Sequence, residues 1–217
     1  MEQKIALVTG ASRGLGAALA EDLARRNYHV VAVARTVGAL EELDDRIRAV
    51  GGTATLAPMS VAEPPAMIQL AQSIGARWGG IDVWAHTAIH AAPLSPVPHT
   101  DPKDMERSIA TNVSATHGLI ALLAPLVVAR DGTAIFFDDP QAGQKFFGAY
   151  GATKGAQTAL ARSWAAESET IGPRVIVATP APMPTAVRAR FYPGEVRDAL
   201  TAPKVEARRI LDEVLAG

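Results

Sequence analysis

The sequence contains no cysteine, which excludes disulfide bonds, thiolate nucleophiles and cysteine-ligated metal sites. It also lacks an excess of either charge, because 21 Lys and Arg residues face 22 Asp and Glu residues, for a formal net charge of -1. A nearly neutral chain has no electrostatic footprint for DNA, RNA or an anionic membrane, so we expect none of these as a partner. A cysteine-free chain suits the cytoplasm, which is the location we expect.

The sequence has no long apolar run either. The longest, Leu119–Ala129, is interrupted by Pro125 and falls short of the roughly 20 residues that cross a bilayer. The N-terminus passes from the apolar run Ile5–Val8 straight into a glycine-rich turn, so we expect no secretory signal. With 217 residues, 48% of them hydrophobic and 20% charged, the composition predicts one globular domain over residues 1–217.

Short apolar segments alternate with longer segments of helical periodicity, and glycine or proline separates most of them. The expected strands are Lys4–Thr9, His29–Ala34, Thr53–Pro58, Ile81–His86, Thr133–Phe137 and Arg174–Thr179. The expected helices are Gly14–Arg26, Val37–Val50, Pro64–Trp78, Pro102–Arg130, Phe147–Ile171 and Pro203–Leu215. This alternation predicts an α/β fold of three layers, in which helices cover both faces of a doubly wound parallel sheet. We expect the Rossmann-type strand order 3-2-1-4-5-6.

A glycine-rich segment follows the first expected strand and opens the first expected helix. Gly10 permits a tight turn, Gly14 lets the backbone approach a pyrophosphate, and Gly16 allows the helix to pack closely on the strand. The helix N-terminus then offers free N–H groups and a partial positive charge to the phosphates. The residues of this turn that we expect at a dinucleotide cofactor are Thr9, Gly10, Ser12, Arg13, Gly14, Leu15 and Gly16.

Three more landmarks follow in order along the chain: Asn112, the segment Tyr150–Lys154, and Pro180 with Thr185. With the Gly-x-x-x-Gly-x-Gly spacing of the turn, the sequence resembles the short-chain dehydrogenase/reductase family over residues 4 to 185. The resemblance implies that Tyr150 protonates a substrate carbonyl oxygen, that Lys154 hydrogen-bonds the nicotinamide ribose, and that Asn112 holds a water of the proton relay. The cofactor contacts that it implies beyond the glycine turn are Val61, Thr87, Ala88, Tyr150, Lys154, Pro180 and Thr185.

The second expected strand ends in Val33–Thr36, without the carboxylate that holds the ribose 2′-hydroxyl in NAD enzymes. Arg35 offers a planar, permanently charged group that can pair with a 2′-phosphate. Arg13 could reach the same phosphate, with the hydroxyls of Ser12 and Thr36 nearby. We therefore expect NADP(H) as the cofactor, and the alternative is that Arg35 is only a solvated residue at a strand end.

Tyr150 and Lys154 are four residues apart, so they share a face of their predicted helix. A tyrosine hydroxyl titrates near pH 10, which is too high for acid–base work at neutral pH. An ammonium group beside it and the charge of an oxidised nicotinamide favour tyrosinate. We therefore expect these charges to lower the pKa of Tyr150.

Asp139 stands where the family usually carries a serine whose hydroxyl donates to the substrate carbonyl. An ionised carboxylate accepts hydrogen bonds but cannot donate one. At about 4 Å from a developing oxyanion it would cost on the order of 4 kcal/mol, or roughly a thousandfold in rate. Activity survives if Asp139 is a neutral donor, or if the substrate supplies a cationic or hydroxyl group instead.

Other segments depart from the family pattern as well. His86–Ile89 stands in place of Asn-Asn-Ala-Gly, Ser60-Val61 in place of Asp-Val, and Pro180-Ala181 in place of Pro-Gly. The family's seventh strand has no counterpart before Gly217, so we expect a sheet without it.

These features together predict an NADP(H)-dependent oxidoreductase that interconverts a carbonyl and an alcohol on a small, largely apolar substrate. Two alternatives stay open: a catalytically weak NADP(H)-binding sensor or regulatory protein, and a structural partner that holds no nucleotide. We expect no metal, because His86 and His90 are four residues apart at a strand end with no third ligand in view.

The aromatic residues gather in the part of the chain that carries the family's substrate pocket. Those that could line an apolar cleft, together with one methionine, are Phe146, Phe147, Met183, Phe191 and Tyr192. Phe136 and Phe137 are expected in the core.

The resemblance also implies a homodimer through the helices Pro102–Arg130 and Phe147–Ile171. Small residues at positions 152, 156, 159 and 166 would allow close packing against a second subunit, and packing within the chain explains them equally well.

Overall fold

The computed structural model describes residues 3–216, so Met1, Glu2 and Gly217 of the expected domain lie outside the described residues. Its strands are β1 (Lys4–Thr9), β2 (Tyr28–Ala34), β3 (Thr53–Pro58), β4 (Val83–His86), β5 (Thr133–Phe137) and β6 (Arg174–Ala178). They form one parallel sheet in the order β3-β2-β1-β4-β5-β6. The expected Rossmann-type order is confirmed, and residues 3–216 contain no seventh strand.

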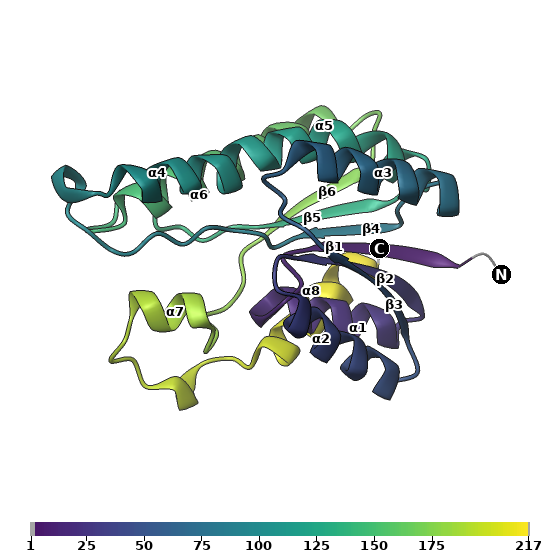
Figure 1. Cartoon of the computed structure of the whole chain (residues 1–217), viewed down its shortest axis with the longest axis horizontal. Coiled ribbons are helices and arrows are strands. Elements are labelled where there is room, and N and C mark those ends of the chain that lie inside the picture. Colours follow the sequence, from purple (N-terminus) through teal and green to yellow (C-terminus); the bar gives the residue numbers. More distant parts are fainter. Residues whose placement is uncertain (1–2, 217) are drawn as a thin grey trace.

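Helices cover both faces of this sheet, as Figure 1 shows. The helices are α1 (Gly14–Arg25), α2 (Val37–Ala49), α3 (Pro64–Trp78), α4 (Pro102–Ser108), α5 (Ala115–Val128), α6 (Gly148–Glu167), α7 (Ala186–Phe191) and α8 (Pro203–Leu215). One buried cluster joins α1, α2 and α8 to the sheet, and a second joins α3, α5 and α6 to the opposite face. Successive residues of a strand point to opposite faces, so Val8 enters the first cluster and Leu7 the second.

The inner strands are apolar and fully covered, as expected for a parallel sheet between two helical layers. Every residue of β2, β4 and β5 is buried. The outer strands β3 and β6 are only partly buried, because each pairs with a neighbour on one side. The expectation of coverage on both faces therefore holds for the centre of the sheet and is wrong at its edges.

The helix expected over Pro102–Arg130 is interrupted by a π-helical turn, Ile109–Ser114, between α4 and α5. A π turn changes the backbone hydrogen-bonding pattern and is frequent at functional sites. By length and by a mean hydropathy of 1.5 over an 18-residue window, the stretch Pro102–Val128 would be long and apolar enough to cross a membrane, which its interrupted apolar run did not predict. In this fold its buried residues Leu119 and Leu123 pack into the second core cluster.

Other boundaries differ from the expected ones by a few residues. β4 begins at Val83 because the preceding Asp82 is held by β1: the Ile5 N–H donates to its carboxylate at 2.6 Å. The fifth expected helix is shorter at both ends and runs over Gly148–Glu167. The short helix α7, which the sequence pattern did not predict, is capped by Thr185 and lies beyond the sheet (Figure 1).

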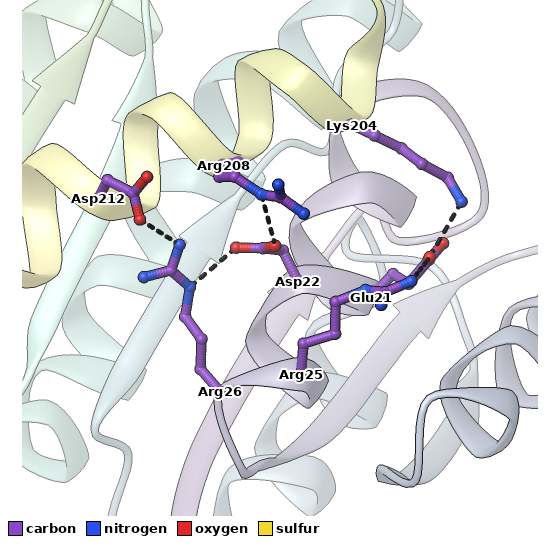
Figure 2. A network of polar contacts seen from close by, with 7 residues as sticks. All are labelled: Glu21, Asp22, Arg25, Arg26, Lys204, Arg208 and Asp212. Carbon is purple, nitrogen blue, oxygen red and sulfur yellow. Dashed lines mark hydrogen bonds and ion pairs between the residues drawn. The ribbon is translucent and has the colours of Figure 1, made fainter.

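A network of charged side chains joins α8 to α1 (Figure 2). Its residues are Glu21, Asp22, Arg25, Arg26, Lys204, Arg208 and Asp212. Lys204 Nζ lies 2.9 Å from Glu21 Oε1, and Arg26 Nη2 lies 2.5 Å from Asp212 Oδ1. The Glu21 side chain is only 6% exposed, so this carboxylate depends on its cationic partners in place of water.

Burial opposes the charged form of Glu21, but hydrogen bonds from Arg25 and Lys204 outweigh it and lower the pKa of this carboxyl. A group whose pKa is lower in the folded state stabilises the fold above its ordinary pKa. That stabilisation is lost as the pH falls from the ordinary value of 4.5 through the lower folded value.

We therefore expect Glu21→Gln to lower the free energy of unfolding by about 1–2 kcal/mol at neutral pH, because it leaves three cations without their partner. The matched control is Glu213→Gln, which removes a 63% exposed carboxylate from Arg209 and should change stability by less than about 0.5 kcal/mol. Urea unfolding at neutral pH and below pH 4.5 measures both. Equal losses for the two variants would contradict a structural role for the buried carboxylate.

Candidate active site

The glycine turn lies between the carboxyl end of β1 and the start of α1. Gly10 has φ +90°, and a Cβ there would approach the backbone nitrogen of Ala88 to 2.6 Å. A Cβ on Gly16 would approach the carbonyl oxygen of Gly10 to 2.3 Å, so this glycine packs against the turn itself. Gly14 has φ +55° and faces the Thr185 methyl group at 3.4 Å. Side chains are thus excluded where a dinucleotide would approach the backbone.

The groups around this turn fit an anionic cofactor. The N-terminus of α1 has no side-chain cap, so its first N–H groups remain available to a phosphate. Arg13 at the turn and Arg35 after β2 both have exposed side chains, and no carboxylate follows β2 before α2. Exposed guanidinium groups beside an uncapped helix N-terminus fit a dinucleotide that carries an extra phosphate.

Thr9 and Thr87 use their hydroxyls within the protein. Thr9 Oγ1 lies 2.8 Å from His86 Nδ1 and accepts from Trp84 Nε1 at 3.3 Å. Thr87 Oγ1 donates to the carbonyl oxygen of Thr9 at 2.9 Å, which holds the loop after β4 against the turn. The Thr9 hydroxyl is thus engaged in a buried polar network, which leaves the Thr9 backbone for the expected cofactor contact.

The remaining expected cofactor residues differ in exposure. Ala88 is buried where Gly10 approaches it, and Thr185 caps α7 by accepting from the Arg188 N–H at 3.3 Å. The half-buried residues of this set are Ser12, Leu15, Val61, Thr87, Pro180 and Thr185, and Thr36 is exposed.

Tyr150, near the start of α6, is 2% exposed, and its hydroxyl donates to Asp139 Oδ2 at 2.8 Å. The loop after β5 carries Asp139, and it reaches α6 because Gly151 has no side chain: a Cβ there would meet the Gln141 carbonyl oxygen at 2.5 Å. The preceding carboxylate, Asp138, is held by Thr158 at 3.0 Å and Arg162 at 2.9 Å. Of these two carboxylates, it is therefore Asp139 that hydrogen-bonds the tyrosine.

The pKa of Tyr150 is raised above its ordinary value by burial first, and then by the charge and hydrogen bond of Asp139. The expected lowering by Lys154 is thus wrong for this structure. The pKa is raised and not lowered because Lys154 Nζ donates to Gln157 Oε1 at 2.5 Å, whereas the Tyr150 hydroxyl donates to the Asp139 carboxylate. Burial lowers the pKa of Lys154 to about 8, so this amine is still largely protonated at neutral pH.

A buried polar network extends from Lys154 to the glycine turn. Gln157 Nε2 donates to Thr116 Oγ1 at 2.9 Å, and His86 Nε2 lies 3.0 Å from the same hydroxyl. His86 in turn contacts Thr9, directly before the turn. Burial lowers the pKa of His86 to about 3, so its ring is neutral at physiological pH. This network fixes the lysine relative to the turn.

Asn112 lies in the π-helical turn and is fully buried. Its Oδ1 accepts from the His90 N–H at 2.7 Å, and its Nδ2 donates to the His90 carbonyl oxygen at 2.9 Å. Nδ2 also lies 3.0 Å from Thr153 Oγ1, one residue before Lys154. The Asn112 side chain thus links the loop after β4 to α6. Because both of its polar atoms are engaged, a relay water would have to be held by the Asn112 backbone.

An aromatic cluster packs over Tyr150. The rings of Phe147 and Phe191 lie 4.9 Å apart, and Phe191 lies 4.8 Å from the Tyr150 ring. Tyr192 joins the same cluster at 6.2 Å from Phe147. Phe146, which was expected beside them, is instead 42% exposed at the surface. Phe136 is buried in the second core cluster, as expected.

Sequence reasoning missed the partners that complete this site. Gln157, Thr116 and Gln141 carry no motif, because their roles follow from contacts between distant segments. The spacing of Gln157 from Lys154 is the one local signal, since residues three apart on a helix share a face. Among residues 3–216, no group of three or more His, Asp or Glu side chains could hold a metal ion.

The chain matches known proteins over nearly its whole length. An oxidoreductase of uncharacterized function from Mycobacterium tuberculosis is 30% identical over 222 residues, which cover 99% of this chain and 82% of that protein. A fatty acyl-CoA reductase from Acinetobacter baylyi is 32% identical over 168 residues, covering 76% of this chain but only 57% of that protein.

Solved structures are similar to it in fold and in sequence. A short-chain dehydrogenase from Shigella flexneri complexed with NADP has a TM-score of 0.86 and 27% identity, covering 94% of this chain and 87% of that chain. One from Escherichia coli complexed with NADPH has a TM-score of 0.87 and 27% identity, covering 99% of this chain and 90% of that chain.

The family model described as short chain dehydrogenase matches residues 4–195, a range that includes the glycine turn, Asn112, Tyr150 and Lys154. The protein therefore belongs to the short-chain dehydrogenase family.

Proposed function

We propose that this protein is an NADP(H)-dependent oxidoreductase that interconverts a carbonyl and an alcohol on a small, largely apolar substrate. A polar network that links the glycine turn to Lys154 through His86 and Gln157 is the main support for this function. It joins a site suited to a dinucleotide with a buried tyrosine and lysine at the same edge of the sheet. Similar structures that contain NADP and NADPH support the cofactor.

The cofactor residues act by charge and by backbone hydrogen bonds. The uncapped N-terminus of α1 binds the pyrophosphate, and Arg13 and Arg35 pair with the 2′-phosphate. Lys154 donates to the nicotinamide ribose, for which its ammonium group turns from Gln157. NADPH, when bound, supplies the hydride.

Tyr150 holds the proton for the substrate oxygen. Its raised pKa keeps the phenol protonated at neutral pH, which favours reduction of a carbonyl over oxidation of an alcohol. To reach a carbonyl oxygen, the hydroxyl leaves Asp139, and the carboxylate then lies beside the developing oxyanion. The aromatic cluster of Phe147, Phe191 and Tyr192 supplies the apolar wall of the substrate site.

A second candidate is a weakly active NADP(H)-binding sensor or regulatory protein. The observation that favours it is the same hydrogen bond, because a Tyr150 hydroxyl held by Asp139 and only 2% exposed is not free to donate to a carbonyl. The two candidates share the cofactor and differ in turnover.

We expect NADPH to bind more tightly than NADH, and Arg35→Ala to narrow the difference by about 1–3 kcal/mol through loss of a charge-assisted contact. The matched control is Arg48→Ala, which removes an arginine on α2 that pairs with Asp44 at 2.7 Å. Fluorescence titration with both nucleotides measures the affinities. Equal affinity of the natural protein for NADPH and NADH would refute the assignment of the arginines.

We expect Tyr150→Phe to abolish carbonyl reduction while leaving NADPH binding largely unchanged, because only the proton donor is lost.

If the protein is an enzyme limited by the charge of Asp139, Asp139→Ser should raise turnover of a generic carbonyl by up to about a thousandfold. The measurement is NADPH oxidation against a panel of aldehydes and ketones. Undiminished reduction by Tyr150→Phe would show that the chemistry lies elsewhere, and NADPH binding without turnover in any variant would favour the sensor.

We also propose a homodimer through α5 and α6, formed by one domain per chain. Ala152, Ala159 and Ala166 are exposed and recur every seven residues along α6, which supports contact with a second subunit over packing within the chain. On the neighbouring helical stretch, Ile109 and Val128 are 42% and 53% exposed. The cytoplasmic location stays a prediction.

Light scattering should therefore report twice the chain mass of 22.7 kDa at micromolar concentration. Ala159→Arg should shift the protein toward the monomer, because a long charged side chain cannot fit a close helix contact. Gln72→Arg, at an exposed position on α3, is the control and should leave the mass unchanged. A natural protein that is monomeric under these conditions would exclude a stable dimer.

A further inference from the structure

The carboxylate of Asp139 is surrounded by hydrogen-bond donors. Oδ2 accepts from the Tyr150 hydroxyl at 2.8 Å, and Oδ1 accepts from Gln141 Nε2 at 2.9 Å. The Gln141 amide is oriented by Tyr192, whose hydroxyl donates to its Oε1 at 3.5 Å. Both carboxyl oxygens of Asp139 therefore act as acceptors toward side-chain donors.

The negative charge at this position has no direct counter-ion among the described residues. Within residues 3–216 Asp139 forms no ion pair, whereas its neighbour Asp138 pairs with Arg162 at 2.9 Å. Lys154 Nζ donates to Gln157, and Arg188 pairs with Glu195 at 2.5 Å. The titratable and charged groups that act on Asp139 or share its surroundings are Asp138, Tyr150, Lys154, Arg188 and Tyr192. An anion that is partly buried without its own cation favours a cationic ligand.

Aromatic rings also pack against Tyr150. Phe147, Phe191 and Tyr192 form one cluster with it, and an arginine already stacks on Tyr192 at 4.7 Å from the ring centroid. The faces of aromatic rings attract cations, and a carboxylate beside such rings is a combination that recognises organic cations. The site therefore offers two kinds of group that favour positive charge, and its hydroxyl donor is already engaged.

From this geometry we infer that the site reduces a protonated carbon–nitrogen double bond, in a small apolar iminium compound, in preference to a carbon–oxygen double bond. The inference rests on the proposed NADPH-dependent hydride transfer and specifies its substrate class. The iminium nitrogen, with its N–H group, would lie against Asp139, where the substrate supplies the donor that the family's serine usually supplies. Phe147, Phe191 and Tyr192 would enclose the apolar part.

Reduction of the iminium group needs no proton from the protein. The hydride of the reduced nicotinamide, with its two electrons, forms a C–H bond at the iminium carbon. The electron pair of the C=N π bond moves to nitrogen, which loses its positive charge and keeps its N–H proton. The products are a neutral amine and the oxidised nicotinamide. No oxyanion develops beside Asp139, and Tyr150 keeps its proton and holds the carboxylate in place.

The experiment compares a cyclic imine, dihydroisoquinoline, with an aromatic ketone of similar size, tetralone, using the full-length protein and NADPH. Turnover is followed by NADPH oxidation and by chromatography of the amine or alcohol, after subtraction of the rate without enzyme. We expect kcat/KM for the imine to exceed that for the ketone by at least about tenfold. Asp139→Asn should remove this preference, and Asp139→Ser should reverse it.

Asp138→Asn is the matched control, because it removes the neighbouring carboxylate that contacts Thr158 and Arg162 but not the tyrosine. It should leave the ratio of kcat/KM for the imine to kcat/KM for the ketone unchanged.

Tyr150→Phe separates the two reactions further: it should abolish ketone reduction and retain part of the imine reduction. The rate with the imine should fall as the pH rises through the pKa of that imine, whereas N-methylated dihydroisoquinolinium, which stays charged, should show no such fall.

Three results would overturn the inference. A natural protein that reduces the ketone at least as well as the imine would show that the carboxylate does not select a cation, while leaving the proposed NADPH-dependent activity intact. An imine preference that Asp139→Asn leaves unchanged would place the selectivity in other residues. Absence of NADPH binding in a fluorescence titration would remove the proposed function and this inference together.

Discussion

The hydrogen bond from the Tyr150 hydroxyl to the Asp139 carboxylate determines what the site can do. At 2.8 Å it holds the phenol proton in a largely water-excluded position, and the charge of Asp139 adds to burial in raising the pKa of Tyr150. A tyrosine of this kind can retain or donate a proton but is a poor base at neutral pH. For the proposed reaction, this means that hydride transfer toward the substrate is the favoured direction.

This contact depends on packing that the fold supplies. The loop after β5 reaches α6 only because Gly151 has no side chain to meet the Gln141 carbonyl oxygen. Further along the same helix, Gln157, which also bonds Thr116 of α5, holds Lys154 toward His86 and the glycine turn. The tyrosine and the lysine thus share a helix but have different partners, which is why the lysine does not offset the effect of the carboxylate on the tyrosine.

The sequence predicted the sheet well because its signals are local. Six apolar segments alternate with helical ones, and fully covered inner strands keep that pattern clear. The glycine turn was equally readable, since φ values of +90° and +55° at Gly10 and Gly14 require glycine. The substitution of Asp139 for a hydroxyl was visible from its place in the chain.

Other features could not be read from the sequence because they arise from contacts between distant segments. The π-helical turn carries Asn112, whose side chain hydrogen-bonds the His90 backbone and Thr153. The short helix α7 lacks the length for a periodic signal, yet it carries Phe191 onto Tyr150. The direction of the pKa change at Tyr150 depended on where the Lys154 amine points, which the spacing of two residues does not determine.

The ionisation of Tyr150 reports directly on its hydrogen bond with Asp139. Nuclear magnetic resonance of the protein labelled with ¹³C at the tyrosine ζ carbon, with the Tyr150 signal assigned by Tyr150→Phe, follows the phenol during a pH titration. At pH near 10, where a free tyrosine is half ionised, we expect Tyr150 to remain protonated. Asp139→Asn should lower the pH at which the Tyr150 phenol ionises. A Tyr150 signal that ionises well below pH 10 in the natural protein would contradict this account.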